Sequence, residues 1–103
     1  MDIVNFPQPL VFEWDGSNEK KIFIKRRITK AEAEQAIFNP HLFWFDEKHS
    51  GSENRYNLLG MSDLGKLLFI AFTIRKNKLR VISARTADKR ERAIYGQKVK
   101  KDS

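Results

Sequence analysis

Three segments in the second half of the chain have the polar and apolar patterns of β-strands. Arg55–Met61 alternates, Leu67–Arg75 is apolar almost throughout, and Leu79–Arg85 alternates again. Alternation is typical of half-exposed strands, and a continuous apolar run is typical of a central strand. The connections SDLGK and KNK have hairpin length, so the three segments predict an antiparallel meander. One face of its last strand is then formed by Leu79, Val81, Ser83 and Arg85.

The first half of the chain predicts a short strand followed by two helices. Pro9–Asp15 has a strand composition, and residues 16–18 form a turn into a helix over residues 18–27, with Ile22 and Phe23 facing inward. Thr29 has capping-box spacing to Glu32, which predicts the start of a second helix. Its inward face carries Ala33, Ala36 and Ile37. Asn39-Pro40 ends this helix, because a residue before proline disfavours helical angles.

A further strand and a last helix complete the predicted elements. His41–Asp46 is the strand, and a polar loop over residues 47–54 follows it. Asp88 and Glu91 have capping-box spacing, which predicts a short helix that ends near Tyr95. We therefore expect one α+β domain over residues 1–103, with a core over about 11–95 and a frayed basic tail over 96–103. It contains an antiparallel sheet of three to five strands, two N-terminal helices and a short C-terminal helix.

The composition excludes several classes of protein. The 103 residues include no cysteine, which excludes disulfides, thiol nucleophiles and cysteine-based zinc sites. Such a chain suits a reducing cytoplasm. No apolar run reaches the length of a membrane span, and the first residues lack the basic start and long apolar stretch of a signal peptide. We expect a cytoplasmic protein without a membrane partner.

Positive charge is concentrated at the end of the chain. Residues 1–74 hold 9 Lys/Arg and 10 Asp/Glu, a net of −1, whereas residues 75–103 hold 11 Lys/Arg and 3 Asp/Glu, a net of +8. The overall charge of +7 therefore comes from the last hairpin strand, the last helix and the tail. Charge concentrated in this way attracts polyanions such as nucleic acids.

Common catalytic motifs are absent. GMSDLGK (Gly60–Lys66) has most of a phosphate-binding loop, but Leu67 replaces the required Ser/Thr and a strand follows, so we assign its glycines to a hairpin turn. His41 and His49 are not spaced as metal ligands, and no cofactor or metal is expected. The arginines, histidines, carboxylates and tyrosines that remain fit metal-independent RNA cleavage, which needs a general base, a proton donor and a fixed cation for the phosphorane.

Four segments together resemble a known family. They are FEWD, ITKAEAEQAIFNP, HSGSENRYNLLGMSDLGKLLFIAFTIR and LRVISARTADKRERAIY. This sequence resembles the BrnT toxins, the ribonuclease half of BrnT–BrnA type II toxin–antitoxin pairs, from about Val11 to Tyr95. The most specific parts are the run from Glu53 to Gly60 and the ISAR…ER..Y ending.

The resemblance implies a RelE-like fold and a cytoplasmic ribonuclease toxin that inhibits translation. It implies a BrnA-like antitoxin of the ribbon-helix-helix class, which buries the basic surface of the toxin and connects it to operator DNA. RNA is the implied substrate. The family commonly has an asparagine and a Lys-His pair on its first helix, where this chain has Ile22 and Lys25-Arg26. If that histidine is the usual acid–base group, His49 or Glu53 takes over its role here.

These arguments select two sets of residues. The candidate catalytic residues are Arg85, Arg55, His49, Glu53 and Lys25. The candidate RNA-binding residues are Arg26, Arg75, Arg80, Lys89, Arg90, Arg92 and Tyr95.

Most of these residues also have a purely structural interpretation. Arg85 either binds phosphate or forms an ion pair with Glu53 or Glu91. Lys25 and Arg26 either bind phosphate or complement a helix dipole. Tyr95 either stacks on a base or packs the last helix onto the sheet. Trp14 and Trp44 are most simply core or interface residues.

Two other functions remain open at this point. One is a catalytically silent BrnT-like binding module that acts in a complex of antitoxin and operator DNA, which the missing first-helix histidine favours. The other is a general RNA- or DNA-binding domain without an antitoxin. Growth arrest and RNA degradation on induced expression separate an active toxin from the silent module, and a neighbouring gene for a ribbon-helix-helix protein would argue against the domain without an antitoxin.

Overall fold

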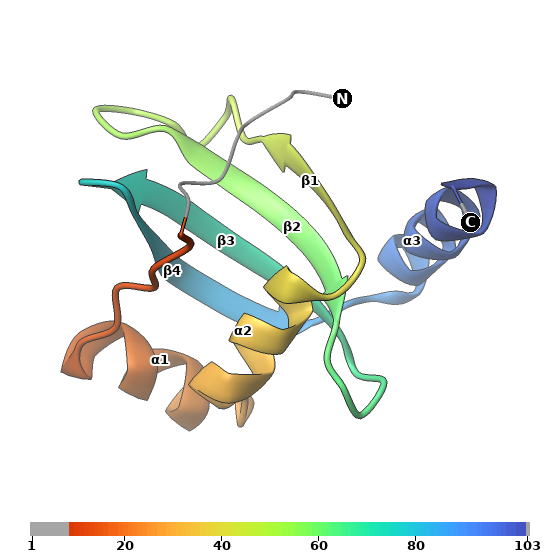
Figure 1. The fold of residues 1–103 in the computed structure, drawn as a ribbon, viewed down its shortest axis with the longest axis horizontal. Helices are drawn as coiled ribbons and strands as arrows, with labels where there is room; N and C mark the ends of the chain where they lie inside the picture. Colours follow the sequence, from red (N-terminus) through yellow and green to blue (C-terminus); the bar gives the residue numbers. More distant parts are fainter. Residues whose placement is uncertain (1–8, 103) are drawn as a thin grey trace.

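The computed structural model describes residues 9–102, except the side chains of Ile24, Lys25 and residues 100–102. Its elements are α1 (Gly16–Arg26), α2 (Lys30–Phe38), β1 (His41–Phe45), β2 (Arg55–Met61), β3 (Leu67–Arg75), β4 (Lys78–Thr86) and α3 (Lys89–Asp102). The four strands form one antiparallel sheet in the order β1-β2-β3-β4 (Figure 1). The α+β class and the antiparallel sheet are confirmed. No helix in the described part of the chain is long and apolar enough to cross a membrane.

Both N-terminal helices begin at side-chain caps. The Asp15 carboxylate accepts hydrogen bonds from the main-chain N–H groups of Ser17 and Asn18, which starts α1 at Gly16, two residues earlier than predicted. The Thr29 hydroxyl accepts from the N–H of Glu32 at 3.2 Å, and the Glu32 carboxylate accepts from the N–H of Thr29 at 3.0 Å. The predicted capping box of α2 is thereby confirmed.

The main core lies between the sheet and the two N-terminal helices. Ala33, Ala36 and Ile37 are buried as predicted, together with Ile22. They pack against Leu58, Leu68, Ile70, Phe72, Leu79, Val81 and Ala84 of the sheet. The prediction that Phe23 faces inward is wrong, because its side chain is 45% exposed and lies beside Arg27.

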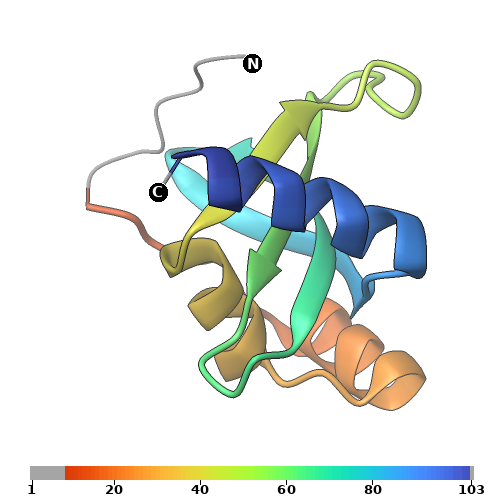
Figure 2. The same ribbon diagram turned by 90° about the vertical axis from the view of Figure 1, so that its right-hand side faces the viewer.

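Helix α3 covers part of the opposite sheet face. Tyr95 is buried there against Leu42, Leu59 and Leu67, and its hydroxyl donates to the carbonyl of Pro40 at 2.8 Å. Figure 2, viewed from the side of α3, shows the helix lying across the strands. The prediction of a short helix with a frayed tail is wrong, since α3 continues to Asp102. Val99 packs against this second cluster, which extends the buried side of the helix beyond Tyr95.

Two other predictions need correction. Pro9–Asp15 is not a full strand: Phe12 makes a single parallel bridge to Leu79 at the edge of β4. Gly65, with φ of 86°, lies in the β2–β3 turn, but Gly60 lies within β2 and not in a turn.

The predicted face of β4 is wrong because the strand contains a bulge. Ala71 lies opposite Ser83, whereas Phe72 lies opposite Val81, so Ile82 is an extra residue in β4. An extra residue reverses the side-chain alternation beyond it. Leu79, Val81 and then Ala84 therefore face α1 and α2, while Ser83 and Arg85 face the opposite side.

Candidate functional site

A shallow pocket lies on the sheet face opposite α1 and α2, beside the part that α3 covers. Asn57, Ala71 and Ser83 lie opposite one another across β2, β3 and β4 and form its floor. These side chains are smaller than those of the flanking row, Leu59, Phe69 and Arg85, which leaves a hollow in the sheet surface. The pocket has a volume of about 370 Å³ and is lined by Asp46, His49, Arg55, Asn57, Phe69, Ala71, Ser83 and Arg85. We call it the His49 pocket.

The β1–β2 loop places a histidine and a carboxylate at the rim of this pocket. Asp46 and the Nδ1 atom of His49 are 2.8 Å apart, and the carboxylate also accepts from the main-chain N–H of His49 at 3.2 Å. Burial raises the pKa of Asp46, but the hydrogen bonds from His49 outweigh burial and leave that pKa below its ordinary value. An ionised Asp46 fixes the imidazole through Nδ1, so Nε2 is the ring nitrogen available for proton transfer.

Arg85 forms the wall of the pocket next to α3. Its guanidinium makes two hydrogen bonds to the carboxylate of Glu91, at 2.7 and 2.8 Å. It also lies over the Phe69 ring, with Cζ 4.2 Å from the ring centroid. The ion pair raises the pKa of Arg85 and lowers that of Glu91. Of the two partners considered for Arg85, Glu91 is the one observed.

Arg55 lies on the opposite side of the pocket and has a different environment. No carboxylate of the described residues lies within ion-pair distance of its guanidinium. Its main chain is fixed, because its N–H donates to the Ser50 hydroxyl at 2.9 Å and its carbonyl accepts from the N–H of Asp46. A half-buried cation in this environment is available to an anionic ligand.

A second hollow adjoins the first at Arg55. Its volume is about 380 Å³, and it is lined by Ser17, Asn18, Lys21, Glu53, Arg55, Arg75, Arg80, Val81 and Ile82. We call it the Arg75 pocket. It lies where the start of α1 meets the edge strand β4.

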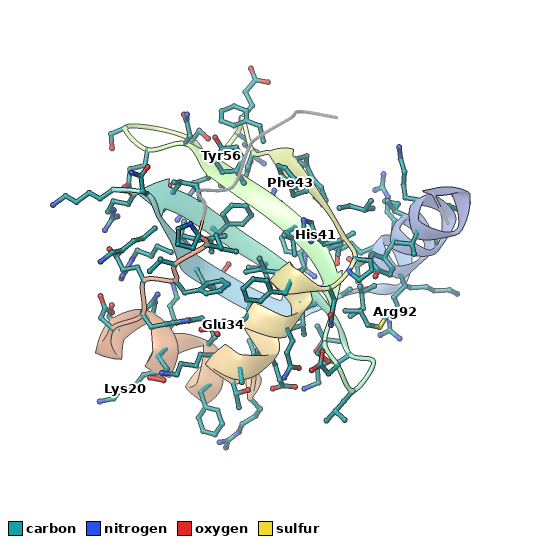
Figure 3. All side chains as sticks on the ribbon, viewed as in Figure 1. Lys20, Glu34, His41, Phe43, Tyr56 and Arg92 are labelled. Carbon is teal, nitrogen blue, oxygen red and sulfur yellow. The ribbon has the colours of Figure 1, made fainter. Side chains whose placement is uncertain are left out.

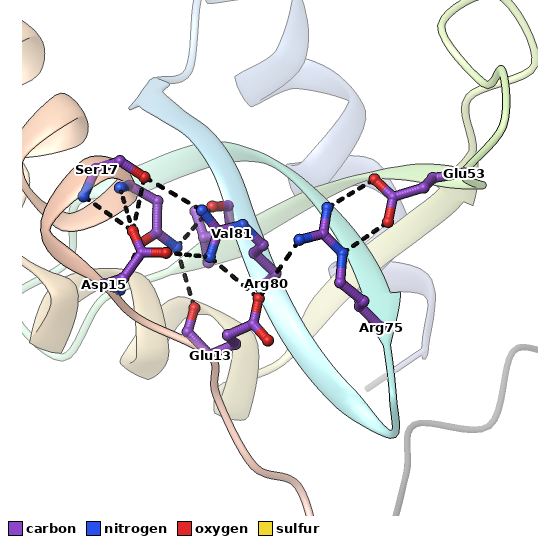
Figure 4. Close-up of polar contacts among 8 residues, drawn as sticks. Glu13, Asp15, Ser17, Glu53, Arg75, Arg80 and Val81 are labelled. Carbon is purple, nitrogen blue, oxygen red and sulfur yellow. Dashed lines mark hydrogen bonds and ion pairs between the residues drawn. The ribbon is translucent and has the colours of Figure 1, made fainter.

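Ion pairs organise the Arg75 pocket (Figure 4). Arg75 binds the carboxylate of Glu53 with two hydrogen bonds of 2.7 and 2.8 Å. Arg80 donates to Glu13 at 3.1 Å and to Asp15 at 2.9 Å, which ties β4 to the cap of α1. The Arg75 guanidinium lowers the pKa of Glu53, and the Ser17 hydroxyl and Arg80 lower that of Asp15.

The predicted catalytic residues thus fall into three groups. His49, Arg55 and Arg85 share the His49 pocket. Glu53 lines the Arg75 pocket and not the His49 pocket. Its carboxylate forms an ion pair with Arg75. The side chain of Lys25 lies outside the described residues.

The predicted RNA-binding residues are more dispersed. Arg75 and Arg80 line the Arg75 pocket, whereas Arg26, Lys89 and Arg90 are exposed on helices α1 and α3. Arg92 lies on α3 (Figure 3), and its guanidinium donates to the carbonyl of Ala87. Tyr95 is 7% exposed, which favours its packing interpretation over stacking on a base.

The sequence interpretation missed four residues of this face. Asp46 and the floor residues Asn57 and Ser83 line the His49 pocket, and Trp44 stands beside Asn57 on β1. Asp46 lies three positions before His49, and this spacing was the available signal for the pair. Ser83 was not recognisable as a floor residue, because the bulge that orients it leaves no mark in the alternation of LRVISAR.

Comparison with known families gives one match. The model of a family described as ribonuclease toxin, BrnT, of type II toxin–antitoxin systems matches residues 14–91. The matched range begins at Trp14 and ends at Glu91, so it includes every residue that lines the two pockets. No curated protein matches this chain.

Proposed function

This chain belongs to the BrnT family of ribonuclease toxins of type II toxin–antitoxin systems, and we propose that it cleaves RNA in the His49 pocket without a metal ion. The observation that carries the proposal is the pairing of two features. An unpaired Arg55 guanidinium faces the same small pocket as an imidazole that Asp46 holds through Nδ1. Cleavage of RNA needs these two elements, a cation for the phosphate and a group that moves the 2′-hydroxyl proton.

The residues have distinct roles in the proposed reaction. His49 Nε2 takes the proton of the ribose 2′-hydroxyl, whose oxygen forms a bond to the adjacent phosphorus. Arg55 stabilises the additional negative charge on the phosphorane, with Arg85 on the opposite wall. The bond from phosphorus to the 5′-oxygen then breaks, and that oxygen takes a proton from water. The products are a 2′,3′-cyclic phosphate end and a 5′-hydroxyl end.

Within the described residues, no group of three or more His, Cys, Asp or Glu side chains is arranged to hold a metal ion. Our proposal therefore assigns the positive charge to arginine. We further propose that cleavage inhibits translation in the cytoplasm. A type II toxin has an antitoxin partner, and we propose a ribbon-helix-helix protein that covers the basic residues and binds operator DNA.

The direct test is cleavage of an RNA oligonucleotide by the purified protein in excess EDTA. We expect 5′-hydroxyl ends, and we expect Arg55→Ala to reduce the single-turnover rate by about 10²–10³-fold. His49→Ala should reduce it by at least about 10²-fold. Lys20→Ala is the matched control, because it removes one positive charge from the far side of α1 (Figure 3) and lines neither pocket.

Each result has a defined meaning. Cleavage that stops in EDTA contradicts the metal-independent mechanism, and full activity in folded Arg55→Ala protein contradicts the assignment of this site. A folded wild-type protein that neither cleaves RNA nor arrests growth would be a silent binding module instead.

A further inference from the structure

An exposed tryptophan extends the floor of the His49 pocket. Trp44 lies opposite Asn57, so Trp44, Asn57, Ala71 and Ser83 form one row across the four strands. The Trp44 side chain is 36% exposed, although its ring packs edge-on against Phe69 with centroids 5.9 Å apart. Phe69 is in turn covered by the Arg85 guanidinium. A continuous surface of indole, phenyl and guanidinium planes therefore borders the pocket.

We propose that this surface binds a single-stranded, unstacked segment of RNA, with one base stacked on Trp44 and its phosphate at Arg55. This inference rests on the proposed function and adds the class of substrate and a residue that selects it. Aromatic rings and arginine planes bind the faces of bases, and they do so with any base because each has a π-face. In a duplex those faces are covered by neighbouring base pairs, so a duplex cannot make the same contact.

The sizes and charges of the two pockets favour the same class of ligand. Each has a volume of about 370–380 Å³. Both pockets are lined by Arg55, so the two sites adjoin and share this cation. Lys21 also lines the second pocket, and we place the next phosphate of the strand at its ammonium group, beside the Arg75–Glu53 ion pair. A flexible single strand can follow such a shallow path, which a rigid duplex would contact only with its outer phosphates.

The position of the other tryptophan supplies an internal contrast. Trp14 packs against the main core on the helix side, and its indole N–H donates to Glu34 at 2.7 Å. Trp44 has no polar partner of this kind among the described residues and adjoins the pocket. Changes in tryptophan fluorescence on addition of RNA should therefore come from Trp44.

The test uses the full chain and a 2′-O-methyl RNA oligonucleotide, which cannot be cleaved because its 2′-oxygens are blocked. Binding should quench the fluorescence of the wild-type protein, and Trp44→Phe should lose most of the quenching while it keeps a smaller stacking surface. Trp44→Leu should weaken binding by roughly tenfold or more. The same oligonucleotide annealed to its complement should also bind at least about tenfold more weakly.

A base-free oligonucleotide of the same length is the control that needs no protein variant. It keeps the phosphates, so weaker binding without quenching supports stacking even if a variant fails to fold. Equal affinity for single strand and duplex, or equal affinity for the base-free strand, would overturn the inference. Absence of binding to any of these probes would also overturn it and would leave Trp44 to a protein partner.

The outcomes separate this inference from the proposed function. Stacking on the uncleavable strand without cleavage of ordinary RNA would support the binding surface and contradict the ribonuclease. Cleavage with an unchanged kcat/KM in Trp44→Leu would support the ribonuclease and contradict the binding surface.

Discussion

The surroundings of Arg85 allow a structural role, as the partner of Glu91, and a functional role, as a cation of the His49 pocket, at the same time. The bidentate pair with Glu91 joins β4 to the first turn of α3, since Glu91 also accepts a hydrogen bond from the N–H of Asp88 at 2.9 Å. The guanidinium nevertheless lines the His49 pocket, and its side chain is 37% exposed. A cation already paired in this way contributes fixed charge to the pocket with little reorganisation.

Two variants separate these roles. Arg85→Ala leaves the largely buried Glu91 carboxylate without its cation, so we expect the free energy of unfolding to fall by about 1–3 kcal/mol. It should also remove most RNA cleavage. In the double variant Arg85→Ala/Glu91→Gln the stability should largely return, because no unpaired charge remains, whereas cleavage should stay low. Urea unfolding and single-turnover cleavage measure the two quantities. Recovery of cleavage in the double variant would show that Arg85 acts only through the structure.

At the scale of helices and strands, the sequence correctly predicts those features that depend only on neighbouring residues. The capping residues Thr29 and Asp88 mark the starts of α2 and α3, because capping is a contact over three residues. The bounds of β2 and β3 follow from alternation and apolar runs. Two features that involve distant residues were missed. The bulge at Ile82 depends on pairing with β3, and Val99 in the C-terminal half of α3 packs against a cluster that includes residues of the sheet.

Dependence on residues that are distant in sequence also limited the prediction of the candidate site. Residue types suited to RNA cleavage were recognisable in Arg55, His49 and Arg85, and the structure brings these three together. Whether each arginine is paired depends on residues far away in sequence, such as Glu13 and Asp15 for Arg80. The concentration of positive charge in the last third therefore overstates the free charge, because carboxylates of the first half neutralise part of it.

Gly60 joins two elements that the sequence interpretation kept apart. A Cβ atom there would clash with the carbonyl group of Ala36, so β2 and α2 pack backbone against backbone at this point. We expect Gly60→Ala to lower the free energy of unfolding by about 1–3 kcal/mol or more, because the helix must move away from the sheet. Gly96→Ala is the matched control: its site in α3 is open, and alanine favours a helix by about 1 kcal/mol. Urea denaturation of both variants tests the opposite signs, and an unaffected Gly60→Ala protein would contradict the contact.

Over the whole molecule, ion pairs connect the segments around the sheet to its strands β3 and β4. Asp15 and Glu13 of the N-terminal segment bind Arg80, Glu53 of the β1–β2 loop binds Arg75, and Glu91 of α3 binds Arg85. These contacts surround the two pockets. They position the β1–β2 loop and α3 beside the sheet face that carries the proposed chemistry, and they tie the start of α1 to β4.

This arrangement predicts a fall in stability in acid. The partner arginines lower the pKa values of Glu53 and Glu91 in the folded protein, so the unfolded chain binds more protons as the pH falls. The free energy of unfolding should therefore be nearly constant near neutral pH. It should decrease as the pH falls toward about 4.3, where unfolded glutamate is half protonated, and on down through the lowered folded-state pKa values. Urea unfolding at a series of pH values measures this decrease.

Glu91→Gln provides the control for one pair. Glutamine removes the titrating group but keeps a hydrogen-bonding side chain, so this variant should be less stable than the wild type near neutral pH and should lose less stability in acid. The two curves should converge once Glu91 is protonated in the wild type, because both proteins then lack the charge opposite Arg85. The general repulsion of a chain with a net charge of +7 grows in acid for both proteins, so it cancels in the comparison. Parallel curves across the whole range would show that the Arg85–Glu91 pair contributes no pH-dependent stability and that the lowered pKa of Glu91 is not coupled to folding.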